Sequence, residues 1–87
     1  MFMYVNNEKL WFVYILLCND NSFYTGCTDN LKRRFEQHNK GFVKSTEMKL
    51  PVSIVTQITF TDKYTAYNFE KYLKSGSGIA FRNKRLV

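Results

Sequence analysis

Blocks of apolar and polar residues along this chain predict alternating strands and helices. Residues 11–18 (Trp-Phe-Val-Tyr-Ile-Leu-Leu-Cys) form an uninterrupted apolar run rich in strand-forming residues, which is typical of a central strand buried on both faces. Turn-forming residues at 19–22 end this run, and residues 23–27 resume the β character directly after them. Residues 11–27 are therefore predicted to form a β-hairpin.

Capping residues and helical spacing predict the remaining elements. Thr28, Asp29 or Asn30 can cap a helix over about 29–39, and residues 42–50, which have no clear period, are expected to form an exposed basic loop. Residues 52–60 are rich in β-branched side chains and predict a third strand. Helices are predicted over about 63–75 and 78–86.

In the last helix, Ile79, Leu86 and Phe81 are expected to face inward, with Arg82, Lys84 and Arg85 outside. The order β-β-α-β-α-α predicts an α+β fold, with a three-stranded, mainly antiparallel sheet flanked by helices. At 87 residues, the chain is long enough for one small core, so residues 1–87 are expected to form a single domain.

The charge balance of the chain gives information about its binding partner. Thirteen Lys and Arg against seven Asp and Glu give a net charge of +6, which indicates a polyanionic partner such as nucleic acid. Small proteins are also often basic merely for solubility. Residues 6–9 interrupt the apolar start of the chain and no membrane-spanning run exists, so we expect a cytoplasmic protein with no membrane partner.

Two cysteines, Cys18 and Cys27, are expected to be free thiols in a reducing compartment. With His38 as the only histidine, the chain cannot supply a dedicated four-ligand zinc site. A catalytic metal would therefore have to be a hard cation bound through oxygen.

Charged residues occupy positions where the helical pattern calls for apolar ones. Arg34 and His38 share a stripe with Leu31 and Phe35, and Glu70 shares one with Ala66, Phe69 and Leu73. Buried charges are costly unless they are paired or bind a metal. An ion pair between Arg34 and Glu70, or side chains that reach out to water, would explain these positions without any function.

The remaining polar candidates also have ordinary explanations. His38 can be a partly buried histidine hydrogen-bonded to a carbonyl, and Tyr14 and Tyr24 can be strand aromatics. Taken singly, none of these residues indicates an activity.

Taken together, the segments Phe12-Val-Tyr14 and Tyr24-Thr-Gly26, followed by Arg34, His38 and Glu70, resemble the GIY-YIG nuclease superfamily. The two tyrosines are ten residues apart and Arg34 follows after another ten, spacings similar to those in the N-terminal nuclease module of the bacterial excision-repair nuclease. The resemblance covers nearly the whole chain, as in a small stand-alone domain.

The resemblance implies a divalent-metal-dependent endonuclease that hydrolyses phosphodiester bonds, with Tyr14, Tyr24, Arg34, His38 and Glu70 as catalytic residues. Glu70 would be the only carboxylate on Mg²⁺ or Mn²⁺, which keeps most of its waters, and Arg34 would hold the scissile phosphate. One tyrosine would help to deprotonate the water, for which its pKa must lie well below the ordinary value of about 10. His38 would assist.

Further residues complete the expected site. Gly26 would allow a close approach of the backbone to the helix or the phosphate, and Asn83 is an auxiliary candidate near the metal. The candidates for contacts with the nucleic-acid backbone are Lys32, Arg33, Lys40, Lys44, Lys49, Arg82, Lys84 and Arg85. No array of side chains suggests base readout.

The shared site places a condition on the hairpin. Because strand side chains alternate between faces, Tyr14 and Tyr24 can share a face only if the loop has an odd number of residues or contains a bulge. We therefore expect a three- or five-residue loop. Neither register places Cys18 opposite Cys27, so no cross-strand disulfide is expected.

The expected substrate is double-stranded or branched DNA, cleaved according to its structure or with low sequence specificity, in repair, recombination or related DNA processing. A protein partner is a candidate source of specificity. The main alternative is a catalytically weak or inactive nucleic-acid-binding module, because Cys27 stands where several excision-repair members have a lysine and the first triplet is altered. A domain that binds protein through its aromatic residues is a third interpretation.

Overall fold

The sheet is built around one apolar strand. In the computed structural model, which describes residues 9–87, β1 (Trp11–Leu17) pairs antiparallel with β2 (Phe23–Thr28) on one side and β3 (Ser53–Phe60) on the other. Residues 1–8 lie outside the described part. Val13 to Leu16 of β1 are buried from both faces, as their continuous apolar pattern predicts.

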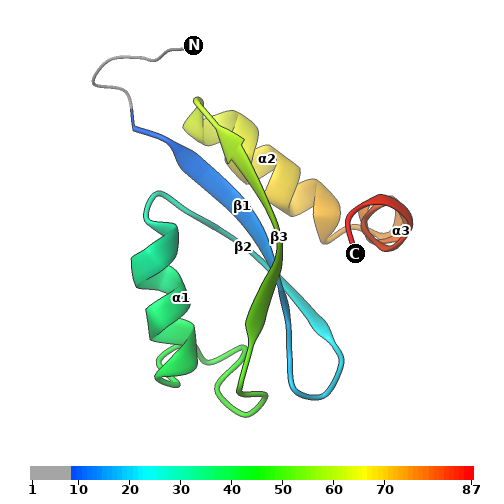
Figure 1. Cartoon of the computed structure of the whole chain (residues 1–87). Helices are drawn as coiled ribbons and strands as arrows, with labels where there is room; N and C mark the ends of the chain where they lie inside the picture. Colours follow the sequence, from blue (N-terminus) through cyan, green and yellow to red (C-terminus); the bar gives the residue numbers. More distant parts are fainter. Residues whose placement is uncertain (1–8) are drawn as a thin grey trace.

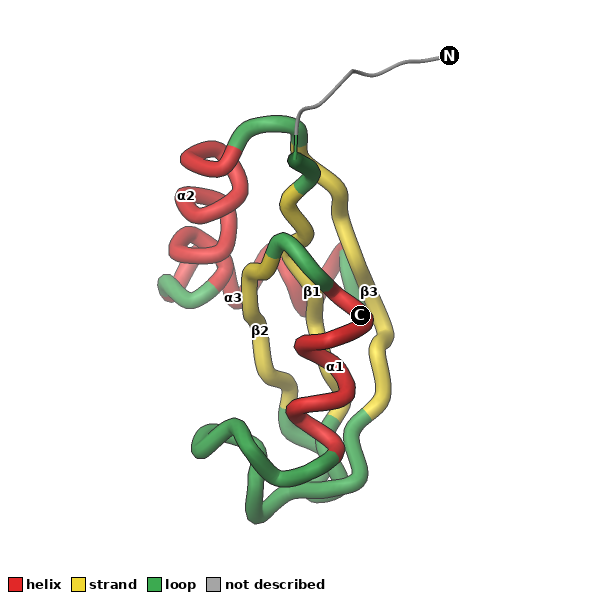
Figure 2. The backbone as a smooth tube through the Cα atoms, turned by 90° about the vertical axis from the view of Figure 1, so that its left-hand side faces the viewer, coloured by secondary structure: helices red, strands yellow, loops and turns green. Residues whose placement is uncertain are grey.

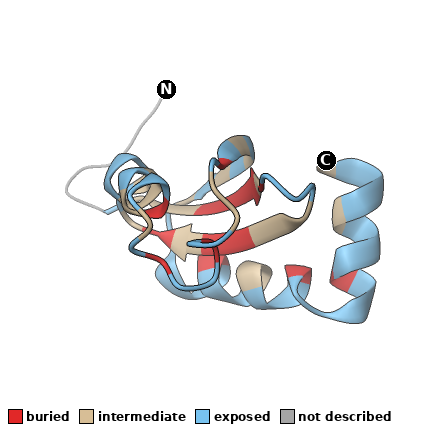
Figure 3. Cartoon of the chain, turned by 90° about the horizontal axis from the view of Figure 1, so that it is seen from below, coloured by how far each residue is buried: buried red, intermediate tan, exposed pale blue. Residues whose placement is uncertain are grey.

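Helices cover both faces of this sheet (Figures 1 and 2). Helix α1 (Leu31–Asn39) packs on the face that carries Tyr14 and Leu16, while α2 (Lys63–Leu73) and α3 (Gly76–Arg85) cover the opposite face. Buried residues accordingly gather in the strands and on the helix sides that face them (Figure 3). The order β-β-α-β-α-α confirms the predicted α+β fold.

The hairpin loop fixes which side chains share a face. Strand pairing ends at Leu17 opposite Phe23, which leaves the five residues 18–22 as the connection. Within it, the Cys18 N–H donates to the Ser22 carbonyl (2.9 Å), the Asn21 N–H donates to the Cys18 carbonyl (2.9 Å), and Asn21 adopts φ 69°. The hydrogen bond between Cys18 and Ser22 closes a tighter turn of three residues, 19–21, within this connection. A three-residue turn that ends in a left-handed residue is a common hairpin connection.

This odd-numbered loop places both tyrosines on one face, as expected. Leu16 pairs with Tyr24 and Tyr14 pairs with Gly26, so Tyr14, Leu16 and Tyr24 all point toward α1. The same register puts Cys27 opposite Val13 and leaves both cysteines as free thiols.

The helix boundaries follow from their caps. Asn30 accepts a hydrogen bond from the Arg33 N–H (3.0 Å), so α1 begins at Leu31. The predicted helix over 63–75 is too long, because Ser75 accepts from the Gly78 N–H (3.2 Å) and caps a new helix that begins at Gly76, two residues before its predicted start.

Two sequence expectations were wrong in detail. Along α3 and its C-cap the least exposed positions are Gly78, Arg82 and Leu86, which follow one another at a spacing of four. Leu86 thus faces inward as expected, whereas Arg82 is unexpectedly half-buried and Ile79 and Phe81 are 38% and 39% exposed. Gly78 packs so closely against the backbone at the end of α2 that an added Cβ would overlap the Tyr72 carbonyl.

The loop after α1 is not uniformly exposed either. Val43 and Thr46 are buried beneath it, while Phe42 and Met48 point outward.

Among residues 9–87, no helix has both the length and the apolar character needed to span a membrane.

The left-handed backbone conformation of Asn21 can be tested by substitution. A β-branched side chain is strongly disfavoured in the left-handed region, so Asn21→Val should lower the free energy of unfolding by about 1–2 kcal/mol, whereas Asn21→Gly should leave it equal or slightly higher. Urea unfolding of the three proteins measures the difference. Equal stability of the valine and glycine variants would contradict this loop conformation.

Candidate functional site

A chain of buried hydrogen bonds joins the sheet to α1 and to the loop that follows it. The Tyr14 hydroxyl lies 2.9 Å from His38 Nε2, and His38 Nδ1 lies 2.8 Å from the Thr46 hydroxyl. The three side chains are 1%, 0% and 0% exposed. Buried polar groups need such partners, so His38 is a fixed part of the interior and not a surface side chain.

The number of available protons sets the direction of these bonds. The Thr46 hydroxyl donates to the Val43 carbonyl (3.4 Å), so it accepts from Nδ1–H of His38. Burial, together with the positive charge of Arg34, lowers the pKa of His38 to about 4, and the imidazole is therefore neutral at pH 7. Its Nε2 is then an acceptor, and Tyr14 donates its proton to it.

The proposed chemistry requires a lowered pKa for one of the two tyrosines, without indicating which, and Tyr14 does not have it. Burial and the neighbouring Tyr24 raise the pKa of Tyr14 to about 12, and the opposing effect of Arg34 is smaller. Tyr14 is therefore a neutral phenol in the resting protein. Any role as a base requires a partner that takes its proton, and His38 occupies that position.

Tyr24 lies beside this chain but is less buried. Its ring centroid is 6.3 Å from that of Tyr14 and 5.0 Å from that of His38, with the rings tilted or edge-on. Gly26 makes this crowding possible, because a Cβ at position 26 would overlap the hydroxyl and ring of Tyr14. The close approach that we expected at Gly26 is thus made by Tyr14.

Arg34 completes the group on the α1 side. It is half-buried, and its guanidinium donates to the Gln37 amide oxygen at 3.1 Å. The anticipated ion pair with Glu70 is not formed in the described structure, where Glu70 instead pairs with Lys74. Arg34 uses one terminal nitrogen for Gln37, and its guanidinium also lies close to the phenols of Tyr14 and Tyr24. Although burial acts in the opposite direction, these phenols raise the pKa of Arg34.

Glu70 reaches the same region from the other side of the sheet. Its carboxylate is 17% exposed and lies 2.9 Å from the Lys74 ammonium, which in turn lies 5.9 Å from the centroid of the Tyr24 ring. Its negative charge also raises the pKa of Tyr14, after the larger effects of burial and Tyr24. Side chains from the two sides of the sheet therefore approach one another around the outer edge of β2.

The five predicted residues are thus brought to one region, but the other candidates are spread out. Asn83 lies on α3, where its amide oxygen accepts two hydrogen bonds from Arg82, at 3.1 and 2.9 Å. The basic residues form two groups on opposite faces of the sheet. Those on α1 and its loop are Lys32, Arg33, Lys40, Lys44 and Lys49, and those on α3 are Arg82, Lys84 and Arg85.

Three residues of this site were missed by the sequence reasoning. Lys74 and Gln37 stand four and three positions after Glu70 and Arg34, so helical spacing alone could have paired them. Thr46 left no such signal, because its partner His38 is eight residues away across a loop without a period.

The donor set bears on metal binding. Among residues 9–87, no three His, Cys, Asp or Glu side chains gather as ligands, so Glu70 is a single carboxylate at this site. One carboxylate fits a hard cation such as Mg²⁺ that keeps most of its waters, and it does not fit a zinc centre.

The buried imidazole predicts a pH dependence of stability. Between about pH 6.5 and pH 4, unfolded His38 binds a proton that folded His38 does not, so the free energy of unfolding should fall as the pH falls through this window. The pKa values of Asp20, Asp29 and Asp62 are also lowered, but the stability that they contribute is lost only below their ordinary pKa of 3.8, outside this window. Urea unfolding at several pH values should give a flatter profile for His38→Gln. Parallel profiles would contradict the neutral, buried imidazole.

The chain is similar in sequence to proteins from bacteria. The chain is 42% identical to a UPF0213 protein from Lacticaseibacillus paracasei over 67 residues, covering 76% of this chain and 75% of that protein. It is 37% identical to a UPF0213 protein from Cupriavidus pinatubonensis over 78 residues, covering 85% and 87%.

A solved structure shares the fold as well. The solution NMR structure of a UPF0213 protein from Bacillus halodurans superposes with a TM-score of 0.56 at 31% identity, covering 88% of this chain and 86% of that one. The profile of the GIY-YIG catalytic domain matches residues 10–83, a span that contains all five predicted site residues. The chain therefore belongs to the GIY-YIG catalytic domain family, whose fold is a nuclease fold.

Proposed function

We propose that this protein is a divalent-metal-dependent endonuclease that hydrolyses phosphodiester bonds in DNA. The observation that carries the proposal is the grouping around Tyr14 and Tyr24 of a phenol hydrogen-bonded to a neutral imidazole, a guanidinium and one carboxylate. Hydrolysis of a phosphodiester needs a proton acceptor, a phosphate clamp and stabilisation of developing charge, and these groups can supply all three.

Arg34 and Tyr24 are suited to hold the phosphate. Arg34 is half-buried beside Tyr14 and presents a planar donor fork, which matches phosphate oxygens better than an ammonium does. Tyr24 has a phenol that is less buried than that of Tyr14 and can donate to the same phosphate. Phosphate clamping by these two groups would fix the reacting centre next to the Tyr14 hydroxyl.

Tyr14 and His38 form a proton relay in this proposal. As a water gives its proton to the Tyr14 oxygen, Tyr14 passes its own proton to His38 Nε2, so no free phenolate needs to exist in the resting enzyme. The positive charge of Arg34 is the second cause of the low pKa of His38. A phosphate bound to Arg34 would offset that charge and make the imidazole a better base.

Glu70 would hold Mg²⁺ or Mn²⁺, taking the cation in place of the Lys74 ammonium that it now pairs with. When bound, the cation supplies charge neutralisation at the phosphate and the leaving oxygen. Lys74 would then be released toward the phosphate, where a second positive charge is useful. This gives the site a lysine from the end of α2 although Cys27 occupies the position after the second triplet.

The basic groups on both faces support binding to the backbone of double-stranded or branched DNA, as positive charge flanks the site on α1 and on α3. We propose cleavage directed by DNA structure or with low sequence specificity, in repair, recombination or related processing, in the cytoplasm. A protein partner that supplies further specificity fits the small size of the domain.

The proposal predicts metal-dependent nicking of supercoiled plasmid. Glu70→Gln and Arg34→Ala should each lower the nicking rate by about 10²-fold or more, because each removes charge stabilisation at the reacting phosphate. Glu36→Gln, which neutralises an exposed acid on α1, should nick at the wild-type rate. Agarose gels with Mg²⁺ or Mn²⁺ measure the rates.

Two outcomes would overturn the proposal. Nicking that survives both substitutions would belong to a contaminant. Salt-sensitive DNA binding by the wild type without any cleavage would identify a catalytically inactive binding module of the same fold.

A pair of glycines tests the position of Tyr14. Gly26→Ala should push the Tyr14 ring away from His38 and lower nicking by about 10²-fold, because small displacements of a reacting group have effects of that size. Gly76→Ala is the matched control, since a Cβ there meets nothing within 4 Å. Circular dichroism should show both variants folded. Full activity of Gly26→Ala would refute the role of the Tyr14 hydroxyl.

A further inference from the structure

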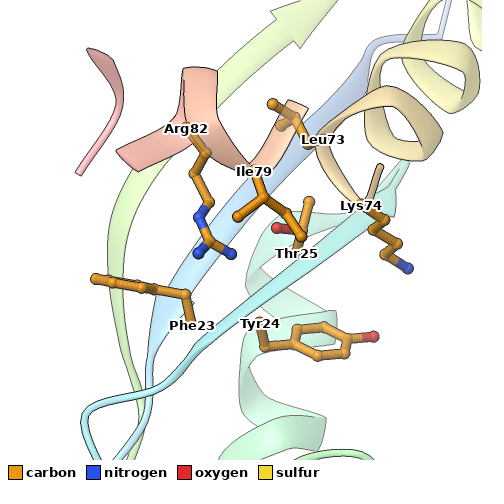
Figure 4. A pocket seen from close by; sticks show the side chains of 7 residues that line it. All are labelled: Phe23, Tyr24, Thr25, Leu73, Lys74, Ile79 and Arg82. Atoms are coloured by element: carbon orange, nitrogen blue, oxygen red, sulfur yellow. The ribbon is translucent and has the colours of Figure 1, made fainter. Parts of the chain in front are cut away.

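A pocket of about 230 Å³ opens along the outer edge of β2, next to the candidate active site (Figure 4). Its walls include Phe23, Tyr24 and Thr25 from β2 and Lys74, Ile79 and Arg82 from the segment spanning the end of α2 and α3. Tyr24 and Lys74 also belong to the site described above, so the pocket continues directly from it.

Two cations are held over aromatic rings at the rim of this pocket. The guanidinium carbon of Arg82 lies 5.1 Å from the centroid of the Phe23 ring, and two hydrogen bonds to the Asn83 amide oxygen fix it there. At the other end, the Lys74 ammonium lies 5.9 Å from the centroid of the Tyr24 ring. The Tyr24 ring itself points toward α1, so the aromatic wall on the α3 side is Phe23. One aromatic ring, with a guanidinium beside it and an ammonium at the other end, suits a planar ring system that is joined to phosphates.

The strand backbone adds hydrogen-bonding groups to this wall. The hydrogen bond from the Cys18 N–H to the Ser22 carbonyl marks a hydrogen-bonded pair, and such pairs alternate along an antiparallel ladder. The backbone of Tyr24 is therefore hydrogen-bonded to that of Leu16, whereas the backbone N–H and C=O groups of Phe23 and Thr25 point outward from the sheet edge. They are donors and acceptors for the polar rim of a bound base.

We propose that this pocket binds one unpaired nucleobase of the strand that is cleaved, from a nucleotide adjacent to the scissile phosphate. The volume lies below the roughly 300–1,000 Å³ of pockets that enclose drug-sized ligands, which suits a single base and leaves no room for a base pair. The inference rests on the proposed nuclease function and narrows its substrate to DNA with unpaired nucleotides at the cleavage point.

The test uses binding without cleavage, in EDTA, so that it does not depend on the reaction. A splayed-arm duplex carries 2-aminopurine as its first unpaired base, and a fully paired duplex of the same length is the reference. Wild-type protein should change the 2-aminopurine emission in step with binding measured by anisotropy, and should bind the splayed-arm DNA at least about fivefold more tightly, as stacking of one base predicts.

Two variants locate the effect. Ile79→Trp fills the pocket from a residue that is 38% exposed and should abolish both the emission change and the preference, and Arg82→Ala should reduce the preference. Ala80→Trp adds the same bulk at an exposed neighbouring position outside the pocket and should keep both.

The outcomes separate the two proposals. Equal preference in Ile79→Trp and Ala80→Trp, or unchanged 2-aminopurine emission, would refute the pocket while leaving plasmid nicking intact. Pocket-dependent binding of the splayed-arm DNA, with no cleavage in Mg²⁺ or Mn²⁺, would support the pocket and refute the nuclease.

Discussion

The buried chain from Tyr14 through His38 to Thr46 is the constraint on which the arrangement depends. It links the central strand, α1 and the following loop through side chains that are almost fully buried, so the loss of one partner leaves the others unsatisfied. The same bonds that dock α1 on the sheet also fix the tautomer of the imidazole. Stability and the orientation of the reactive phenol therefore have one physical origin.

The sheet edge explains how residues from opposite faces meet. Helix α2 packs on the face away from Tyr14, yet Glu70 and Lys74 lie where β2 ends the sheet and, among residues 9–87, no further strand pairs with it. An edge strand is normally a liability because its outward backbone groups are unpaired. Here positive side chains line that edge, which discourages pairing with another strand and attracts an anionic ligand.

The sequence predicted the strands from their local pattern. The shared face of the tyrosines was expected from the family resemblance, and it required an odd-numbered hairpin loop, which the structure has. Prediction from the sequence failed where tertiary packing decides. On α3, Arg82 is more buried than Ile79, although the sequence pattern predicted the reverse. Gly78 packs closely against the backbone of Tyr72, and this contact sets the rotation of the helix. The raised pKa of Tyr14 depends on burial by distant segments, which no spacing along the chain reveals.

The hairpin register also explains which letters of the two triplets are needed physically. Tyr14, the last residue of the first triplet, pairs directly with Gly26, the last residue of the second, and its ring occupies the space that a side chain at Gly26 would fill. Val13 and Thr25 point to the other face, where their size and branching fit the core under α2 and α3. Substitutions at Val13 and Thr25 are therefore expected to leave the tyrosine and its imidazole partner in place.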